Sequence, residues 1–398
     1  MPALERSAFM VQKAILKVSH QVHSATKRGR AKDISWVVGP DELALMVAHI
    51  SEAVPRSHSV SLSSHSFYAR RYDTQLRSSR SARLDYLLRI VNGPWLMGKL
   101  MTRAKGFIYI GASGFLLSGQ DNRAAEFEFV KSNGLKLVCY FTGDDIRAPR
   151  LMHELEARTG QPNISTFLSE VSSVFDSDEY DATKRHIAAS ADRFADVIFT
   201  AAADQLSYLT RPTEPFLYFY PDSQFRLLER KFVSYDRLVV LHAPSSPALK
   251  GTPLVRDAVE RLRADGYDFE YVELLGVDNE TVLRELGRAH IVLNQFYAFI
   301  PGVFGIEALA STCAMLCSAD ERIETGLPAG ANDAWLVTKS DEIHQNLRRL
   351  LDDPLEMREL AVAGYRWALE NVSKSADEVK MRRILAAALD RGDEPIGR

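Results

Sequence analysis

The sequence predicts an α/β protein made of two units, each with a parallel sheet covered by helices. Two observations support this fold class. Apolar segments with strand character alternate with helical segments, which is typical of a parallel sheet buried on both faces. The alternation pauses near residues 222–235 and then restarts, and 398 residues are enough for two domains.

The first half of the chain carries five apolar segments with strand character. The segment at 41–54 shows helical spacing of its apolar residues and two acids, Asp41 and Glu42, in its first turn. Another helix, at 3–27, precedes the first strand. The expected strands cover 34–39, 58–67, 106–113, 135–141 and 195–202.

The alternation resumes at about residue 236. The helix expected at 252–266 has clear end signals, with Thr252 as N-cap, Pro253 at its first position and Gly266 near its end. Helices are expected to close the chain at 340–353, 354–372 and 376–390. The expected strands of this half cover 236–244, 268–275, 290–296, 314–318 and 334–338.

Composition is that of an ordinary globular protein, with 46% apolar and 25% charged residues. The net charge of −3 does not point to a nucleic-acid partner, and none is expected. Charge is unevenly distributed, however, because residues 1–110 carry a net +10 and the rest −13. The front of the chain is therefore expected to meet something anionic.

The expected location is the cytoplasm, with a second possibility at the inner face of the membrane. No segment is an obvious membrane span or signal peptide, and Cys139, Cys313 and Cys317 suggest buried thiols in a reducing compartment. The helix at 3–27 either lies on an anionic bilayer or packs on the body of the protein. Its basic residues include Lys13 and Lys17, followed by Lys27, Arg28, Arg30 and Lys32.

One candidate site centres on Glu307, in the stretch from His290 to Ser318. An apolar strand leads through a glycine-containing loop into a short apolar helix that carries this acid. Burying an unpaired carboxylate costs several kcal/mol, roughly, so Glu307 is expected to be paired or to hold a ligand. The alternative is an acid in the first helical turn that interacts with the helix dipole.

A second candidate site lies at 242–252, where a strand delivers the loop HAPSSPALKGT. Free N–H groups at a helix start can bind an anion, Lys250 adds a positive charge, and Gly251 allows close approach to the backbone. A surface loop with a chance Lys-Gly pair is the alternative. Metal chemistry is not required by this arrangement.

Both loops follow strands of the second unit, so both are expected beyond the carboxyl ends of one sheet. Ser245, Ser246, Lys250 and Gly251 would contact a diphosphate, and Glu307 suits the two vicinal hydroxyls of a ribose. The implied ligand is a nucleoside diphosphate that carries a further group.

The pattern HAPSSxxxKGT followed by GVFGIEALA resembles the C-terminal domain of GT-B glycosyltransferases of the retaining family-four type. GASGFLL and EFEFVKSNGLKLVCYFTGDDIR resemble the N-terminal domain of bacterial members that build surface polysaccharides. The resemblance implies two Rossmann-like domains whose parallel sheets face each other across a cleft. It implies an acceptor domain at 1–228, a donor domain at 229–375, and a helix at 376–398 that packs back on the first domain.

The resemblance also implies residue roles. Lys250 would bind the donor diphosphate and Glu307 the donor ribose, while His242 would bind phosphate or sugar or be a packed strand-end histidine. The donor-binding residues are expected to be His242, Ser245, Ser246, Lys250, Gly251, Gln295, Gly302 and Glu307, and the acceptor-side residues Gly39, Gly114, Thr142 and Arg147.

Two positions depart from the family pattern. Phe299 stands where the family often has an acid, eight residues before the ribose glutamate, and Thr142 stands where related bacterial sequences often have a histidine. Asp144 and Asp145 remain as catalytic candidates. Alternatively, one of them caps the next turn and Arg147 pairs with the other.

The resemblance implies a glycosyltransferase without a cofactor or metal. Its partners would be a nucleotide-sugar donor, a glycan or lipid-linked acceptor, and an anionic membrane surface. The alternatives are a nucleotide-sugar epimerase on the same fold and a non-catalytic binding subunit.

Overall fold

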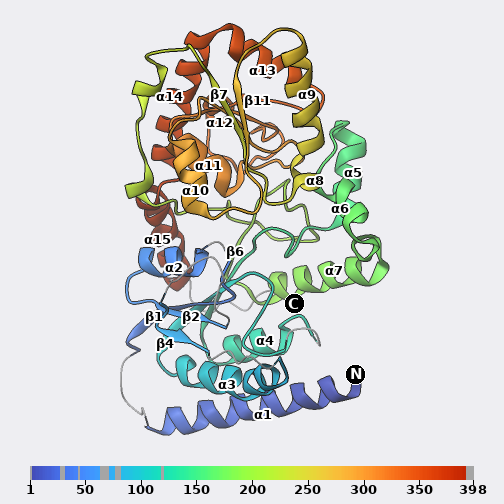
Figure 1. Ribbon diagram of the computed structural model, residues 1–398. Coiled ribbons are helices and arrows are strands. Elements are labelled where there is room, and N and C mark those ends of the chain that lie inside the picture. The colour runs from blue at the N-terminus through green and yellow to red at the C-terminus, as the bar shows by residue number, and fades with distance from the viewer. Residues whose placement is uncertain are drawn as a thin grey trace.

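The computed structural model describes residues 2–26, 32–43, 45–62, 71–76, 82–117 and 121–390. Figure 1 shows two α/β units, with the N-terminal unit below and the C-terminal unit above. The first unit holds a sheet ordered β3-β2-β1-β4-β5-β6 and the second a sheet ordered β11-β10-β9-β7-β8. All paired strands are parallel, which confirms the predicted fold class.

Helices cover both faces of the first sheet. One apolar cluster lies under α1, α3, α4 and α7, and a second lies under α2 and the C-terminal helix α15. The strands are β1 Ile34–Pro40, β2 His58–Ser61, β3 Thr74–Gln75, β4 Ala104–Ile110, β5 Lys136–Tyr140 and β6 Val197–Phe199. The helices are α1 Pro2–Thr26, α2 Met46–Ala53, α3 Ala82–Met101, α4 Ala124–Ser132, α5 Pro149–Thr159, α6 Ile164–Val171 and α7 Asp178–Phe194.

The second sheet is also covered on both faces. Helices α10, α11 and α14 pack on one face, and α9 and α13 on the other. The strands are β7 Val239–His242, β8 Glu270–Glu273, β9 Ile291–Leu293, β10 Ala314–Cys317 and β11 Leu336–Val337. The helices are α8 Pro247–Lys250, α9 Thr252–Ala264, α10 Asn279–Leu286, α11 Gly302–Ala310, α12 Ala331–Ala334, α13 Ile343–Asp352, α14 Pro354–Asn371 and α15 Lys374–Asp390.

The C-terminal helix α15 runs from the second unit down to α2 of the first (Figure 1). Met381 and Leu385 of α15 join the apolar cluster of Trp36 and Ile50. The segment 200–238 connects the sheets in the opposite direction, and the expected domain boundary at 228/229 lies within it. The two units are therefore joined by two crossings of the chain.

Some expectations about the elements differ from the structure. Helix α2 begins at Met46, so Asp41 and Glu42 precede it instead of lying in its first turn. The Glu42 carboxylate instead accepts a hydrogen bond from the Tyr72 hydroxyl, at 2.6 Å. Lys27, Arg28 and Arg30, and the end of the strand expected at 58–67, lie outside the described residues.

The three cysteines are buried thiols, as predicted. Within the part of the chain that the structure describes, each helix is too short or too polar to cross a membrane.

Candidate functional site

Lys250 and Glu307 line the same cavity, at the carboxyl end of the second sheet. The cavity has a volume of about 330 Å³ and is also lined by Ser245, Gln295 and Gly302. Lys250 comes from the segment after β7, and Glu307 from the helix after β9, and these two strands are hydrogen-bonded neighbours. The parallel arrangement of β7 and β9 therefore brings the two candidate loops together.

Lys250 ends the short helix α8, and its ammonium donates a hydrogen bond to Gln295 Oε1. Burial lowers the pKa of Lys250, while the carboxylate of Asp204, from the first unit, acts in the opposite direction. A buried ammonium at the edge of a cavity is an electrostatic partner for an anionic ligand. Gly251, at φ +78°, separates α8 from α9 and packs against Phe296 and Tyr297.

Glu307 lies in the second turn of α11, five residues after its first residue. This position excludes the first-turn interaction with the helix dipole that was the alternative reading. Asn279 Nδ2 donates to Glu307 Oε1 at 2.8 Å. Burial raises the pKa of Glu307 to about 7, although the hydrogen bond from Asn279 acts to lower it. The carboxyl can thus hold or release its proton near neutral pH.

The loop that leads into α11 is held by its own strand. Asn294 Nδ2 donates to the Pro301 carbonyl at 2.8 Å, and Gln295 Nε2 donates to the Ile300 carbonyl. Gly302 begins α11 at φ +67° and lines the cavity. The first N–H groups of a helix lack intrahelical partners, so this helix start adds donors beside Lys250.

His242 is a packed strand-end histidine, one of the two interpretations of this residue. Its Nδ1 contacts the Leu293 carbonyl at 2.7 Å, and its Nε2 contacts Thr252 Oγ1 at 2.9 Å. The Thr252 hydroxyl is therefore engaged and does not cap α9, which corrects the expected N-cap; Gly251 occupies that position. Ser246 precedes α8 and lies outside the set of residues that line the cavity.

The acidic pair of the first unit is engaged in local contacts. Asp145 accepts hydrogen bonds from the Thr142 backbone N–H and from its hydroxyl, both at 2.8 Å. Asp144 pairs with Arg147, and Arg147 also pairs with Asp204 at 2.5 Å. These contacts match the alternative in which one acid caps the turn and the other pairs with Arg147.

Gly39 and Gly114, which were expected on the acceptor side, lie in close packing. A Cβ at Gly39 would lie 2.2 Å from the Val60 carbonyl oxygen, and one at Gly114 would lie 2.4 Å from Glu126 Oε2. Gly39, at φ +144° and against backbone, therefore requires glycine, whereas a side chain at Gly114 would displace the buried Glu126 carboxylate.

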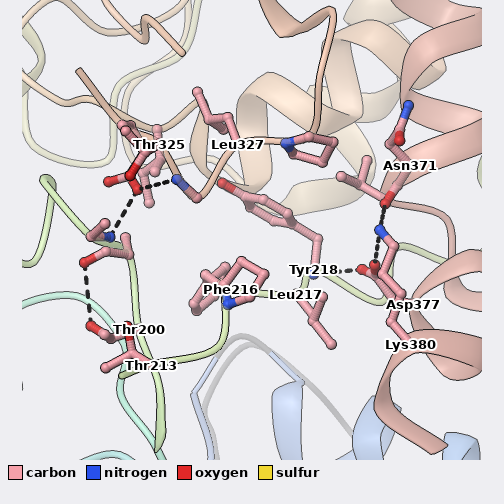
Figure 2. A pocket seen from close by; sticks show the side chains of 18 residues that line it. Thr200, Thr213, Phe216, Leu217, Tyr218, Thr325, Leu327, Asn371, Asp377 and Lys380 are labelled. Atoms are coloured by element: carbon pink, nitrogen blue, oxygen red, sulfur yellow. Dashed lines mark hydrogen bonds and ion pairs between the residues drawn. The ribbon is translucent and has the colours of Figure 1, made fainter. Parts of the chain in front are cut away.

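A larger cavity of about 480 Å³ lies between the two units (Figure 2). The connecting segment contributes Phe216 and Tyr218, and α15 contributes Asp377 and Lys380. The Asp377 carboxylate accepts the N–H of Tyr218 at 2.8 Å. Tyr218 also lines a small cavity of about 130 Å³ that includes Glu307, so the inter-unit space adjoins the candidate site.

Sequence reasoning missed Asn279, Asp204 and Glu324. Asn279 could have been found, because it is a polar residue at a helix start soon after β8, at the same sheet edge as the two candidate loops. Asp204 and Glu324 act between units and carry no local pattern. Among the described residues, no group of three or more His, Cys, Asp or Glu side chains is arranged to hold a metal ion.

No family model and no curated protein matches the chain. Solved structures do. A sucrose-phosphate synthase from Thermosynechococcus elongatus is 12% identical with a TM-score of 0.56, over 90% of this chain and 100% of that one. HepE from Anabaena, in complex with UDP, is 12% identical with a TM-score of 0.53, over 89% and 100%. A glycosyltransferase from Rickettsia africae is 11% identical with a TM-score of 0.53, over 91% and 100%.

The chain has the GT-B fold. These similarities extend over about nine-tenths of this chain and the whole of the others, and so include both units. At 11–12% identity they concern the fold, so the activity has to be argued from the site.

Proposed function

We propose that the protein is a glycosyltransferase that moves a sugar from a nucleotide-sugar donor to an acceptor, without a metal and with retention of configuration. The observation that carries this proposal is the convergence of Lys250, Glu307 and the start of α11 on one cavity. Retention and metal independence rest on the resemblance to family-four enzymes. The proposed acceptor is a glycan, a lipid-linked molecule or another acceptor in surface polysaccharide or glycoconjugate synthesis.

Each group has a separate role in this proposal. Lys250 and the N–H groups at the start of α11 bind the diphosphate and stabilise its charge as it leaves. Ionised Glu307 accepts hydrogen bonds from the two ribose hydroxyls, and Asn279 orients its carboxylate. In this proposal, closure of the cleft over the bound donor excludes water, which favours transfer over hydrolysis.

Calorimetry with nucleotide sugars tests the donor site. Lys250→Ala and Glu307→Ala should each weaken binding about tenfold or more, because a hydrogen bond to a charged group contributes about 1.5–3 kcal/mol. Lys339→Ala and Glu280→Ala remove the same charges from exposed positions and should bind like wild type. Retained affinity in both site variants would contradict the assignment.

Product analysis separates glycosyl transfer from its two alternatives. A glycosyltransferase consumes the donor when an acceptor is present and releases the nucleoside diphosphate. An epimerase would convert the nucleotide sugar without acceptor or net loss of donor. A non-catalytic subunit would bind the donor without turnover across a broad acceptor panel.

The proposal includes peripheral binding to an anionic membrane from the cytoplasmic side, through helices α1 and α3. These helices pack together at the end of the first unit farthest from the second unit (Figure 1). Their outer sides expose eight large apolar side chains, between 42% and 61% exposed: Met10, Val11, Val18, Val22, Leu84, Leu87, Val91 and Trp95.

Basic residues on the two helices indicate that the membrane surface they would bind is anionic. Arg6, Lys13 and Lys17 lie at helical spacing beside Met10, and Arg89 and Lys99 lie on α3. Apolar side chains that enter the headgroup region and cations that meet acidic lipids are the features of an interfacial helix. A membrane surface next to the first unit suits a lipid-linked acceptor.

Vesicle sedimentation tests the membrane surface. Wild type should bind vesicles that contain phosphatidylglycerol, and less so at higher salt, because screening weakens the cationic contribution. Leu87→Ser and Lys17→Glu should each reduce binding. Val379→Ser, which alters an exposed apolar residue on α15, is the matched control. Equal binding of all variants, or equal binding to neutral vesicles, would contradict this part of the proposal.

A further inference from the structure

Residues 297–302, which we call the donor loop, are held by contacts from the first unit as well as by contacts within the second unit. Asp204 lies in the segment after β6 of the first unit. Its Oδ1 accepts a hydrogen bond from the backbone N–H of Phe299, at 2.8 Å. The Asp204 side chain is only 2% exposed. A hydrogen bond from a backbone N–H to a buried carboxylate that is also paired with an arginine is among the stronger kinds in a protein.

Arg147 fixes the direction of the Asp204 carboxylate. Its Nη2 donates to Asp204 Oδ2 and its Nε to the Asp204 carbonyl, both at 2.5 Å. The first unit therefore aims a pre-oriented carboxylate at the second. Asp204 is also the leading opposite charge acting on Lys250, so it lies within electrostatic range of the donor diphosphate site.

Glu324 makes the reciprocal contact from the second unit. Its buried carboxylate accepts the N–H groups of Ala202, Ala203 and Asp204, at 2.8, 2.8 and 2.9 Å. Each unit thus places one carboxylate on the backbone of the other. Both contacts require the two units to be close together.

The side chain at 299 accounts for the departure from the family pattern. Phe299 forms one buried apolar cluster with Met152 and Leu155 of α5 and with Ala203 of the segment after β6. Nearby, the ring of Tyr297 packs on Phe167 of α6, with centroids 4.1 Å apart. The donor loop thus contacts the first unit in three ways: through the apolar packing of Phe299, the ring contact of Tyr297 and the hydrogen bond to Asp204.

We propose that Asp204 is a positioning residue for the transfer reaction. From the opposite unit it orients the donor loop, and it thereby links completion of the donor site to closure of the cleft. The inference rests on the proposed function. Asn294 and Gln295 donate to the Pro301 and Ile300 carbonyls from within the second unit, whereas Asp204 binds the loop from the first unit and would lose this contact if the units separated. The Phe299 side chain packs on the first unit in the same arrangement, and the Asp204 carboxylate binds the Phe299 backbone N–H.

Kinetics and binding together test this role. Asp204→Ala should lower kcat about tenfold or more while affinity for UDP stays within about threefold, because Lys250, Asn279 and Glu307 remain in place. Asp204→Asn keeps an oxygen for Phe299 but turns an amide toward Arg147, so its kcat should be intermediate. Asp192→Asn removes the charge from another loop-holding carboxylate, which accepts the Thr210 N–H, and should leave kcat unchanged.

Two further measurements keep the inference separate from protein folding and from the proposed function. Small-angle X-ray scattering should show a larger radius of gyration for Asp204→Ala than for wild type without ligand, whether or not a turnover assay is found. Phe299→Glu should lose kcat, because it buries an acid among apolar side chains next to Asp204. Three results would each overturn the inference. Asp204→Ala could keep the wild-type kcat and radius of gyration, or it could lose as much UDP affinity as Lys250→Ala. Phe299→Glu could also retain full activity. Failure of wild type to bind or use any nucleotide sugar would instead overturn the proposed function.

Discussion

Glu307 illustrates how burial sets the chemistry of one side chain. The carboxyl lies among apolar residues of α11, with Asn279 as a hydrogen-bond donor, and its pKa is raised to about 7. The ionised form is the one that can accept both ribose hydroxyls. In the empty protein near neutral pH, the two forms are therefore present in comparable amounts.

This pKa predicts a pH dependence of donor binding. Affinity for a nucleotide sugar should rise with pH from about 6 to about 8, by up to roughly tenfold, because the ionised fraction of Glu307 rises through its pKa. A nucleotide sugar is the appropriate ligand, since its diphosphate has no proton to lose in this interval. Calorimetry at several pH values measures the effect.

Glu307→Gln is the control for this prediction. Its amide stays neutral, so its weaker affinity should lose the component that titrates near pH 7. An equally steep rise in the variant would assign the titration to another group.

At the scale of elements, α15 is the clearest case of one helix joining two units. It starts beside α14 in the second unit, and its apolar residues pack on α2 in the first. Near its start, the Asp377 carboxylate accepts the N–H groups of Tyr218 and Phe219, at 2.8 and 3.0 Å. The connecting segment and the C-terminal helix are thus held together at the place where the chain passes between units.

Asp377→Ala should destabilise the protein by about 2–4 kcal/mol, because it leaves two buried backbone N–H groups without their acceptor. Thermal unfolding followed by circular dichroism should show a melting temperature lowered by several degrees. Arg383→Ala, at an exposed position on the same helix, should melt like wild type. A melting temperature unchanged in Asp377→Ala would show that these hydrogen bonds contribute little.

At the scale of the whole molecule, the cleft between the units is bridged by buried polar contacts as well as by the two chain crossings. The Glu324 carboxylate accepts the N–H of Ala203, and the Asp204 carboxylate accepts the N–H of Phe299, which also packs across the same boundary. Cross-boundary contacts of this kind couple the unfolding of two domains.

Differential scanning calorimetry tests the coupling. Wild type should unfold in a single transition. Glu324→Ala should separate or broaden it, because the buried N–H groups of Ala203 and Asp204 and the part-buried N–H of Ala202 lose their acceptor. Glu321→Ala, which alters a neighbouring acid in the same loop, provides the comparison. A single sharp transition in Glu324→Ala at the wild-type temperature would contradict the coupling.

The sequence by itself determined the elements and the edge of the sheet where the candidate site lies. Buried runs such as 135–141 and 290–296 are read from local composition, and alternation with helices requires parallel strands. Parallel strands end at the same edge, so the loops that carry Lys250 and Glu307 had to converge. Helix ends such as that of α9 were less well determined, because the Thr252 hydroxyl bonds to His242 instead of capping.

Only the tertiary structure decided which polar groups act between units. Asp204 and Phe299 are 95 residues apart, and Glu324 is 120 residues from Asp204. Local patterns report the propensity of neighbouring residues, whereas contacts at these separations depend on how the two units are placed by the connecting segment and α15. The same placement gave Phe299 its partners in α5, which no spacing in the sequence could indicate.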